Sequence, residues 1–279
     1  MNYISIADAY RTAGISNEVI KEDDVLQHIY AAENAVLRDT KNIYWDRKLE
    51  NQTVSSAADN SLTQLNAQWA INKFSNCYIW IFKGKGKDQI RQVTTNTADT
   101  INIDRDWDEN PDDTSRFRIF YVPEQFNPFL ELTLDGTDTN TMIFDYYPIV
   151  LVEKLVSNDI EISVDKLLIW NKVGRIRINQ GAEYSLFFGK LPQKVEINYW
   201  YGVDYLPYEI KRLVELKAAI QMLSQQMGGT YNVPSTISLP DSSISIGQAY
   251  INIKTSQDTM IAEYDKLLEK TVKIYPVFG

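Results

Sequence analysis

The sequence has few of the residues on which most catalytic and metal sites depend. It contains one cysteine, Cys77, and one histidine, His28, among 279 residues. A single cysteine excludes an internal disulfide, so we expect folding in a reducing environment. Two residues cannot supply the four cysteine and histidine ligands of a structural zinc site. His28 has no nucleophile or orienting acid near it in sequence, and we expect a surface or packed histidine on a helix.

Long apolar runs and basic tracts are also missing. No segment approaches the roughly 20 consecutive apolar residues that cross a bilayer, and the first residues lack the charged and apolar regions of a signal peptide. The 28 lysines and arginines are outnumbered by 37 acidic residues, which gives a formal net charge of −9. This balance argues against a general nucleic-acid clamp but suits a channel wall that does not hold DNA. We expect no membrane association and no cofactor.

The residues that are present favour a globular chain with both helices and strands. Hydrophobic residues make up 44% of the sequence and aromatic residues 12%, which suits a packed core, β-structure and contact surfaces. A first helix is predicted from about Asp23 to Asn42, opened by a capping box of Asp24 and Gln27. Its apolar residues recur at helical spacing, at Val25, Ile29, Ala32 and Val36. A second helix begins at Leu206-Pro207 and ends at Gly228-Gly229, and a third covers about residues 256–273.

Two stretches show the alternation of strands. Short β-favouring segments recur within residues 53–122, and a second set recurs within residues 144–203. The expected fold class is therefore α+β: a helical bundle with three main helices, an antiparallel β domain and an inserted small β module. The expected division is listed in chain order: an N-terminal arm and first helix (1–52), the inserted β module (53–122), the β domain (123–203) and a helical part with a long arm loop and a C-terminal tail (204–279).

Three motifs could carry chemistry, and each has a simpler interpretation. Asp104, Asp106 and Asp108 alternate like the start of a calcium loop, but Glu109 stands where that loop needs glycine; an irregular calcium site stays open beside a solvated acidic turn. Gly84-Lys85-Gly86-Lys87 precedes a strand, whereas a phosphate loop opens a helix, so a lysine-rich hairpin tip is favoured. Carboxylate-pair catalysis on carbohydrates needs a cleft, which a sequence alone cannot reveal.

Several segments, taken in order, resemble the head–tail connector (adaptor) family of tailed bacteriophages. The first is the acidic start and helix at Asp24 to Glu33. The second is the β segment from Tyr147 to Gly202, with Tyr-Pro-Ile-Val-Leu-Val-Glu-Lys-Leu, then Gly174-Arg175-Ile176, then Val-x-Ile-x-Tyr-x-Tyr-Gly. The third is the proline-led helix at Leu206-Pro207. Residues 76–121 resemble, in addition, a small β module of phage structural proteins. Its insertion makes this chain longer than a minimal adaptor.

The resemblance implies a structural protein of the virion neck and not an enzyme. It implies a dodecameric ring beneath the portal protein that passes phage DNA without sequence-specific binding and joins the tail or the next neck protein, assembled in the host cytoplasm. The apolar residues near the end of the sequence are the candidate portal-docking residues: Ile274, Tyr275, Val277 and Phe278. No catalytic, cofactor or metal residues are expected. The alternatives are a phage tail or receptor-binding component that contacts glycans, and a carbohydrate-active enzyme.

Overall fold

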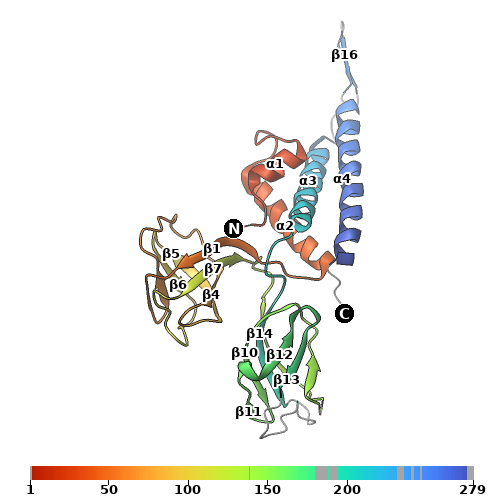
Figure 1. Cartoon of the computed structure of the whole chain (residues 1–279). Coiled ribbons are helices and arrows are strands. Elements are labelled where there is room, and N and C mark those ends of the chain that lie inside the picture. Colours follow the sequence, from red (N-terminus) through yellow and green to blue (C-terminus); the bar gives the residue numbers. More distant parts are fainter. Residues whose placement is uncertain are drawn as a thin grey trace. The chain divides into compact units, whose positions relative to one another are not determined.

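The computed structural model of the chain describes residues 2–137, 139–179, 188, 194–230, 236–239, 242–245 and 247–274. The described residues belong to two compact units, whose elements are labelled in Figure 1. Residues 42–206 form a β unit. Residues 2–41 and the described residues from 207 onward form a helical unit.

The predicted fold class is wrong in its proportions. The described residues are mostly antiparallel β-structure, with 14 strands in three sheets, a separate two-stranded hairpin and four α-helices. A three-helix bundle with a small β module does not describe this. The prediction missed strands that are too short to show alternation, such as β2 (Ser56–Ala58) and β9 (Thr141–Ile143). It also missed β1 (Asp46–Thr53), because that strand is polar along nearly its whole length.

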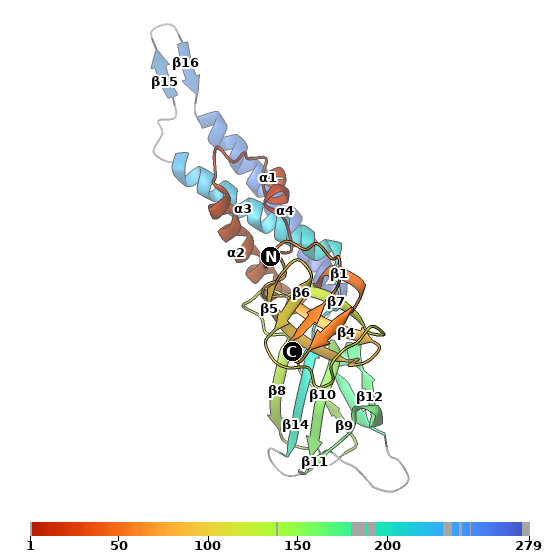
Figure 2. The ribbon, with the colours of Figure 1, turned by 90° about the vertical axis from the view of Figure 1, so that its left-hand side faces the viewer.

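The helical unit contains α1 (Ile6–Ala13), α2 (Glu22–Thr40), α3 (Tyr208–Thr230) and α4 (Gly247–Ile274). α3 packs against each of the other three helices. Between α3 and α4 in the sequence, β15 (Thr236–Leu239) pairs with β16 (Ser242–Ser245). Figure 2 shows this hairpin beyond the ends of α3 and α4. The last helix is longer than predicted, because it begins at Gly247 and not near residue 256.

The apolar stripe of α2 is confirmed. Its residues are all fully buried: Val25, Ile29, Ala32 and Val36. The capping box at Asp24 and Gln27 is wrong, because α2 begins at Glu22 and its N-cap residue is Lys21, which makes no side-chain capping bond. A capping box lies instead at the start of α1. There the Ser5 hydroxyl accepts a hydrogen bond from the Asp8 backbone N–H at 3.1 Å, and the Asp8 carboxylate accepts one from the Ser5 backbone N–H at 3.3 Å.

Polar contacts join α4 to α2 and to α3. The Tyr264 hydroxyl donates to a carboxylate oxygen of Asp39 at 2.7 Å. Arg212 Nε donates to Glu263 Oε1 at 2.9 Å. Tyr264 is buried, whereas Ile261, three residues earlier on the same helix, is 39% exposed.

The β unit begins with a seven-stranded antiparallel sheet. Its strand order is β1-β7-β4-β5-β6-β3-β2. The bounds not yet given are β3 (Ser61–Thr63), β4 (Tyr78–Lys83), β5 (Gln89–Asn96), β6 (Thr100–Ile103) and β7 (Arg116–Tyr121). The pairing of β5 with β6 shifts register between Val93 and Thr95 of β5, which indicates a β-bulge in this strand.

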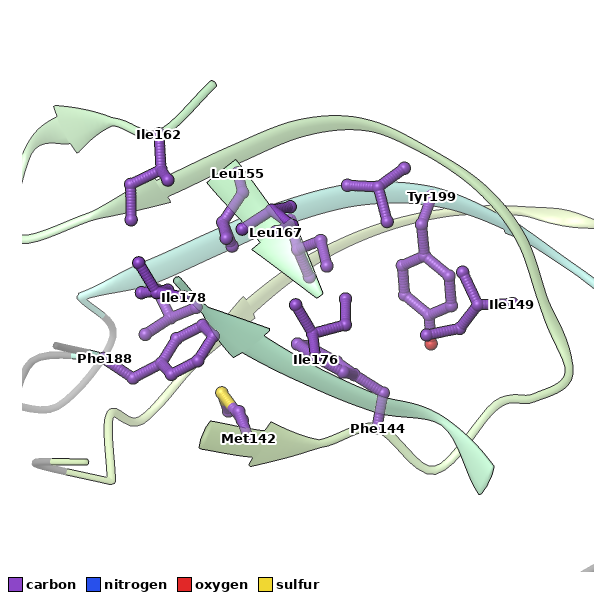
Figure 3. Close-up of a cluster of buried hydrophobic side chains, with 13 residues drawn as sticks. Met142, Phe144, Ile149, Leu155, Ile162, Leu167, Ile176, Ile178, Phe188 and Tyr199 are labelled. Atoms are coloured by element: carbon purple, nitrogen blue, oxygen red, sulfur yellow. The ribbon is translucent and has the colours of Figure 1, made fainter. Parts of the chain in front are cut away.

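The rest of the β unit is a sandwich of two smaller sheets. The four-stranded sheet has the order β11-β10-β14-β8 and the three-stranded sheet the order β12-β13-β9. The new bounds are β8 (Phe129–Leu134), β10 (Ile149–Ser157), β11 (Ile160–Glu161), β12 (Leu167–Trp170), β13 (Arg175–Ile178) and β14 (Val195–Tyr201). Figure 3 shows the core between them, with Ile176 and Ile178 of β13 and Tyr199 of β14. Val195 and Ile197 of β14 belong to the same buried cluster. This core fixes which side chains must point outward from each sheet.

Candidate interaction surfaces

The outer face of the three-stranded sheet is the first candidate surface. On β13, Ile176 and Ile178 are buried in the sandwich core, and Arg175 and Arg177 alternate with them and are exposed. The register pairs Arg177 with Leu168 of β12 and Thr141 of β9. It pairs Arg175 with Trp170 and Ile143 in the same way. Because directly paired residues of antiparallel strands share a face, these six side chains lie on one outer surface. We call it the arginine–tryptophan face: Thr141, Ile143, Leu168, Trp170, Arg175 and Arg177.

This face is more apolar than the solvated side of a sheet usually is. An antiparallel sheet with one buried side normally places polar residues on the other. Here Ile143 is 68% exposed, Leu168 43% and Trp170 41%. The Arg175 guanidinium lies 5.0 Å from the centre of the Trp170 ring, in cation–π contact. Tryptophan and arginine are enriched in protein–protein contacts, so this combination indicates a surface that another molecule covers.

The outer face of the four-stranded sheet is the second candidate surface, and its charge is opposite to that of the arginine–tryptophan face. One row of register partners consists of Glu161, Val156, Glu196 and Thr133, and the next of Lys154, Asn198 and Glu131. We call these seven residues the glutamate face. Lys154 Nζ lies 3.9 Å from Glu196 Oε2, and Asn198 Nδ2 donates to Glu131 Oε1 at 3.3 Å. With three glutamates and one lysine, this face is net acidic, and it lies on the opposite side of the sandwich from the arginine–tryptophan face.

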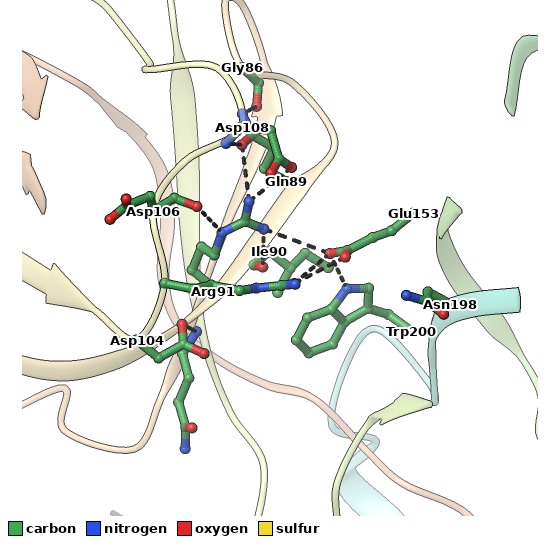
Figure 4. A network of polar contacts seen from close by, with 12 residues as sticks. Gly86, Gln89, Ile90, Arg91, Asp104, Asp106, Asp108, Glu153, Asn198 and Trp200 are labelled. Atoms are coloured by element: carbon green, nitrogen blue, oxygen red, sulfur yellow. Dashed lines mark hydrogen bonds and ion pairs between the residues drawn. The ribbon is translucent and has the colours of Figure 1, made fainter. Parts of the chain in front are cut away.

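A buried arginine joins the seven-stranded sheet to the sandwich (Figure 4). Arg91 on β5 is 1% exposed. Its guanidinium donates to two backbone carbonyl oxygens, those of Asp106 at 3.0 Å and Ile90 at 2.9 Å, and it pairs with Asp108 at 2.9 Å. Glu153 of β10 lies 3.8 Å from Arg91 Nη1 and also accepts from the Trp200 indole at 2.7 Å. Arg91 is therefore internal and does not belong to the exposed charge of the lysine-rich hairpin tip before it.

The acidic segment 104–108 wraps around this arginine. The Asp104 carboxylate accepts from the Gln92 backbone N–H at 2.9 Å, and Arg105 pairs with Glu153 at 3.0 Å. In the part of the chain that the structure describes, no cluster of three or more acidic, histidine or cysteine side chains could hold a metal ion. The calcium alternative therefore has no ligand set in these ranges, and the acidic residues cap backbone groups and a guanidinium.

The Gly84-x-Gly86 pair serves close packing of the hairpin tip. Both glycines have positive φ, +86° and +68°. A Cβ on Gly84 would lie 2.3 Å from the backbone oxygen of Thr114, and one on Gly86 would lie 2.6 Å from that of Glu109. The loop leads into strand β5, as predicted, and not into a helix. Its glycines let the tip approach the 109–115 segment, which is sufficient physical reason for them.

The single histidine joins two helices, and the single cysteine is buried. The ring Nε2 of His28 lies 2.6 Å from Gln225 Oε1, which joins α2 to α3. Cys77 is fully buried, and burial raises the pKa of its thiol to about 12. A thiol of this kind is a poor nucleophile at neutral pH.

The predicted portal-docking residues fall at the edge of what the structure covers. Ile274 is the last residue of α4. Tyr275, Val277 and Phe278 lie outside the described residues. The sequence patterns did not predict either outer face of the sandwich. A signal was present in Arg-Ile-Arg-Ile, where alternation places both arginines outward, but the register that adds Trp170 and Ile143 to them is a tertiary feature.

Comparisons with known proteins return nothing that identifies the chain: no protein-family model matches it, and no curated protein matches it. The search for helices long and apolar enough to span a membrane finds none among the described residues. The adaptor resemblance of the sequence motifs is therefore carried forward as a hypothesis.

Proposed function

We propose that this chain is a structural head-to-tail adaptor subunit of a tailed phage. In this proposal, copies form a ring beneath the portal protein, pass the DNA through the ring and present a platform to the tail or the next neck protein. The location is the neck of the virion. The chain acts through its surfaces, and no residue has a catalytic role.

One observation carries the proposal most directly. The two helices that resemble the family, α2 with its acidic start and α3 with its leading proline, are separated by the whole β unit in sequence, yet they pack together. His28 and Gln225 make contact across 197 residues. The two resembling helices thus belong to one helical unit, and the resembling β segment from Tyr147 to Gly202 belongs to the β unit that separates them in sequence.

The surfaces are consistent with this role. An assembly subunit needs exposed patches that are apolar and charged in complementary ways, and the two outer faces of the sandwich have that character. The acidic balance of the whole chain, −9, suits a ring that passes DNA without holding it. In the same proposal the apolar residues 274–279 dock on the portal, because an apolar peptide segment can add to a groove or sheet edge of a partner.

The test is imaging by negative stain of the purified protein, alone and with the portal protein of the same phage. Rings, or caps on portal rings, are the expected result. A monomer or trimer that leaves portals bare and binds oligosaccharides would instead favour the glycan-contacting tail component.

A second experiment addresses the docking residues. A chain without residues 274–279 is expected to keep the secondary structure and tryptophan fluorescence of the full chain but to leave portals uncapped. A matched control replaces Tyr208, a 75% exposed residue at the start of α3, with alanine. Normal capping by the truncated chain would remove the docking role from these residues and leave the adaptor proposal standing.

A further inference from the structure

We infer that the arginine–tryptophan face of one copy docks on the glutamate face of the next copy, so that the sandwiches of neighbouring subunits stack. This inference rests on the proposed function for its setting, since it names the partner and the surfaces through which the ring closes. Its own evidence is the charge, exposure and register of the two faces.

The first argument is charge complementarity within one molecule. The arginine–tryptophan face holds two cations and no acid, and the glutamate face holds three acids and one cation. Arginine binds carboxylates through a planar fork of donors, which makes such pairs strong when water is displaced. A second copy of this chain therefore offers Arg175 and Arg177 an acidic surface, which the described residues of their own subunit do not place on this face.

The second argument is spacing. Arg175 and Arg177 are two residues apart on one strand, so their Cα atoms are about 7 Å apart. Glu196 pairs with Thr133, and Asn198 with Glu131, so Glu131 and Glu196 are diagonal neighbours on adjacent strands. Such diagonal neighbours are about 7–8 Å apart. The two arginines can therefore reach the two glutamates at the same time.

The third argument is apolar burial. Ile143, Leu168 and Trp170 are exposed in the single chain, and stacking would cover them with the uncharged part of the glutamate face, Val156 and Thr133. Tryptophan and arginine are both enriched among energetically dominant contact residues, and this face presents Trp170 and Arg175 side by side.

The placement of the two faces fits a ring. They lie on opposite sides of one sandwich, so each copy gives one face to each neighbour. Such a heterologous contact does not close a dimer, and it produces a ring when the rotation between copies closes. A nucleic acid could also meet two arginines through its phosphates, but the exposed isoleucine, leucine and tryptophan beside them favour a protein surface.

The experiment is a reciprocal charge swap. One variant carries Arg175→Glu and Arg177→Glu, which makes both outer faces acidic. The other carries Glu131→Lys and Glu196→Lys, which makes both faces basic. Each variant alone is expected to self-associate at least about 100-fold more weakly than the natural chain, in sedimentation velocity and in portal capping, because like charges meet at every contact. An equimolar mixture is expected to restore assembly, with the two variants alternating.

The control variant changes the charge at a different place on the β unit. Lys85→Glu with Lys87→Glu makes the same charge change on the hairpin tip and should assemble like the natural chain. Restoration by mixing cannot come from a folding defect, since neither variant alone would assemble. If either variant alone assembles normally, or if mixing does not restore assembly, the stacked interface is wrong. Loss of DNA binding in the arginine variant, without rescue by mixing, would mark the face as a phosphate site. If the natural chain neither self-associates nor caps portals, the proposed function fails as well.

Discussion

Tyr264 on α4 donates its hydroxyl hydrogen to Asp39 on α2 at 2.7 Å, across 225 residues of sequence. The tyrosine is buried, and burial followed by the bond to Asp39 raises the pKa of its hydroxyl above the ordinary value. Asp39 lies off the apolar stripe of α2. The hydrogen bond from the Tyr264 hydroxyl gives the Asp39 carboxylate a partner where α2 meets α4. This pair ties the last helix of the chain to the first long one.

The raised pKa of Tyr264 predicts alkaline instability of the helical unit. An unfolded tyrosine loses its proton near pH 10, while the folded one keeps it, so the unfolded state binds fewer protons above that pH. The contribution of Tyr264 is thus full below about pH 10 and is lost as the pH rises further. Tyr264→Phe should lower the unfolding free energy by about 1 kcal/mol at neutral pH and flatten the decline above pH 10.

Urea unfolding followed by circular dichroism at pH 8 to 11 measures this. Tyr208→Phe, at an exposed position, is the control and should leave both the midpoint and the slope with pH unchanged. Equal slopes in the natural chain and the Tyr264 variant would show that the bond to Asp39 does not hold the proton.

The buried Arg91 predicts a large difference between two neighbouring arginines. Arg91→Met removes the donor for the carbonyls of Asp106 and Ile90 and leaves acidic groups without it, so we expect a loss of about 3 kcal/mol from the β unit. Arg105 also pairs with Glu153, but its side chain is 43% exposed, so Arg105→Met should lose at most about 1 kcal/mol.

Tryptophan fluorescence during urea unfolding is the appropriate signal. All six tryptophans lie within residues 42–206, so this signal follows the β unit. Similar midpoints for the two methionine variants would mean that the buried network is dispensable.

Arg91 also shows how far the sequence could predict this structure. Gln89-Ile90-Arg91-Gln92-Val93 alternates, and the prediction of a strand there is confirmed. The alternation suggested that Arg91 faces water, yet Gln89, Ile90 and Arg91 are all buried. The outer side of this strand is covered by the segment after β6, whose carbonyl of Asp106 and carboxylate of Asp108 receive the guanidinium. The alternation of a strand predicts which of its sides faces the main core. It cannot show that a loop from another part of the chain covers the other side.

Helical periodicity is limited in the same way, because it predicts one apolar face and misses buried polar residues outside that face. The stripe of α2 was readable because four apolar residues repeat at helical spacing over the length of the helix. Glu33 breaks that pattern, and it is fully buried, with its carboxylate accepting the Tyr3 backbone N–H at 2.5 Å. The alternation in β13 predicts that its arginines point outward. The face that they form with Trp170 depends on the pairing of β13 with β12, which the sequence of a single strand does not reveal.

The capping box of α1 gives a comparison between an observed and a mispredicted cap. Ser5→Ala removes the acceptor for the Asp8 N–H and should lower the stability of the helical unit by about 1 kcal/mol. Asp24→Ala, at the predicted cap, removes only a charge near a helix start and should lower it by about 0.3 kcal/mol. Circular dichroism during urea unfolding separates these values. A larger effect at Asp24 would show that the helix is capped where the sequence pattern indicated.

Gly202, the last residue of the Tyr-x-Tyr-Gly motif, lies at a close approach that no other residue fits. Its φ is +122°, and a Cβ there would lie 2.7 Å from Trp45 Nε1 and 2.9 Å from the Ile43 carbonyl oxygen. The strand pairing beside it depends on this contact, since Trp45 N donates to the Val203 oxygen at 2.9 Å and Val203 N to the Ile43 oxygen at 2.8 Å.

Gly202→Ala should therefore destabilise the β unit by about 3 kcal/mol, through backbone strain and displacement of Trp45. The change should be visible in tryptophan fluorescence, as a lower urea midpoint and an altered native spectrum of Trp45. Gly14→Ala is the matched case of a positive φ without a clash, because its φ is +66° and nothing lies within 4 Å of a Cβ there. It should destabilise the helical unit by about 1 kcal/mol and leave the native tryptophan spectrum unchanged. If the two alanine variants lose equal stability, backbone conformation alone explains Gly202, and the contact with Trp45 contributes nothing.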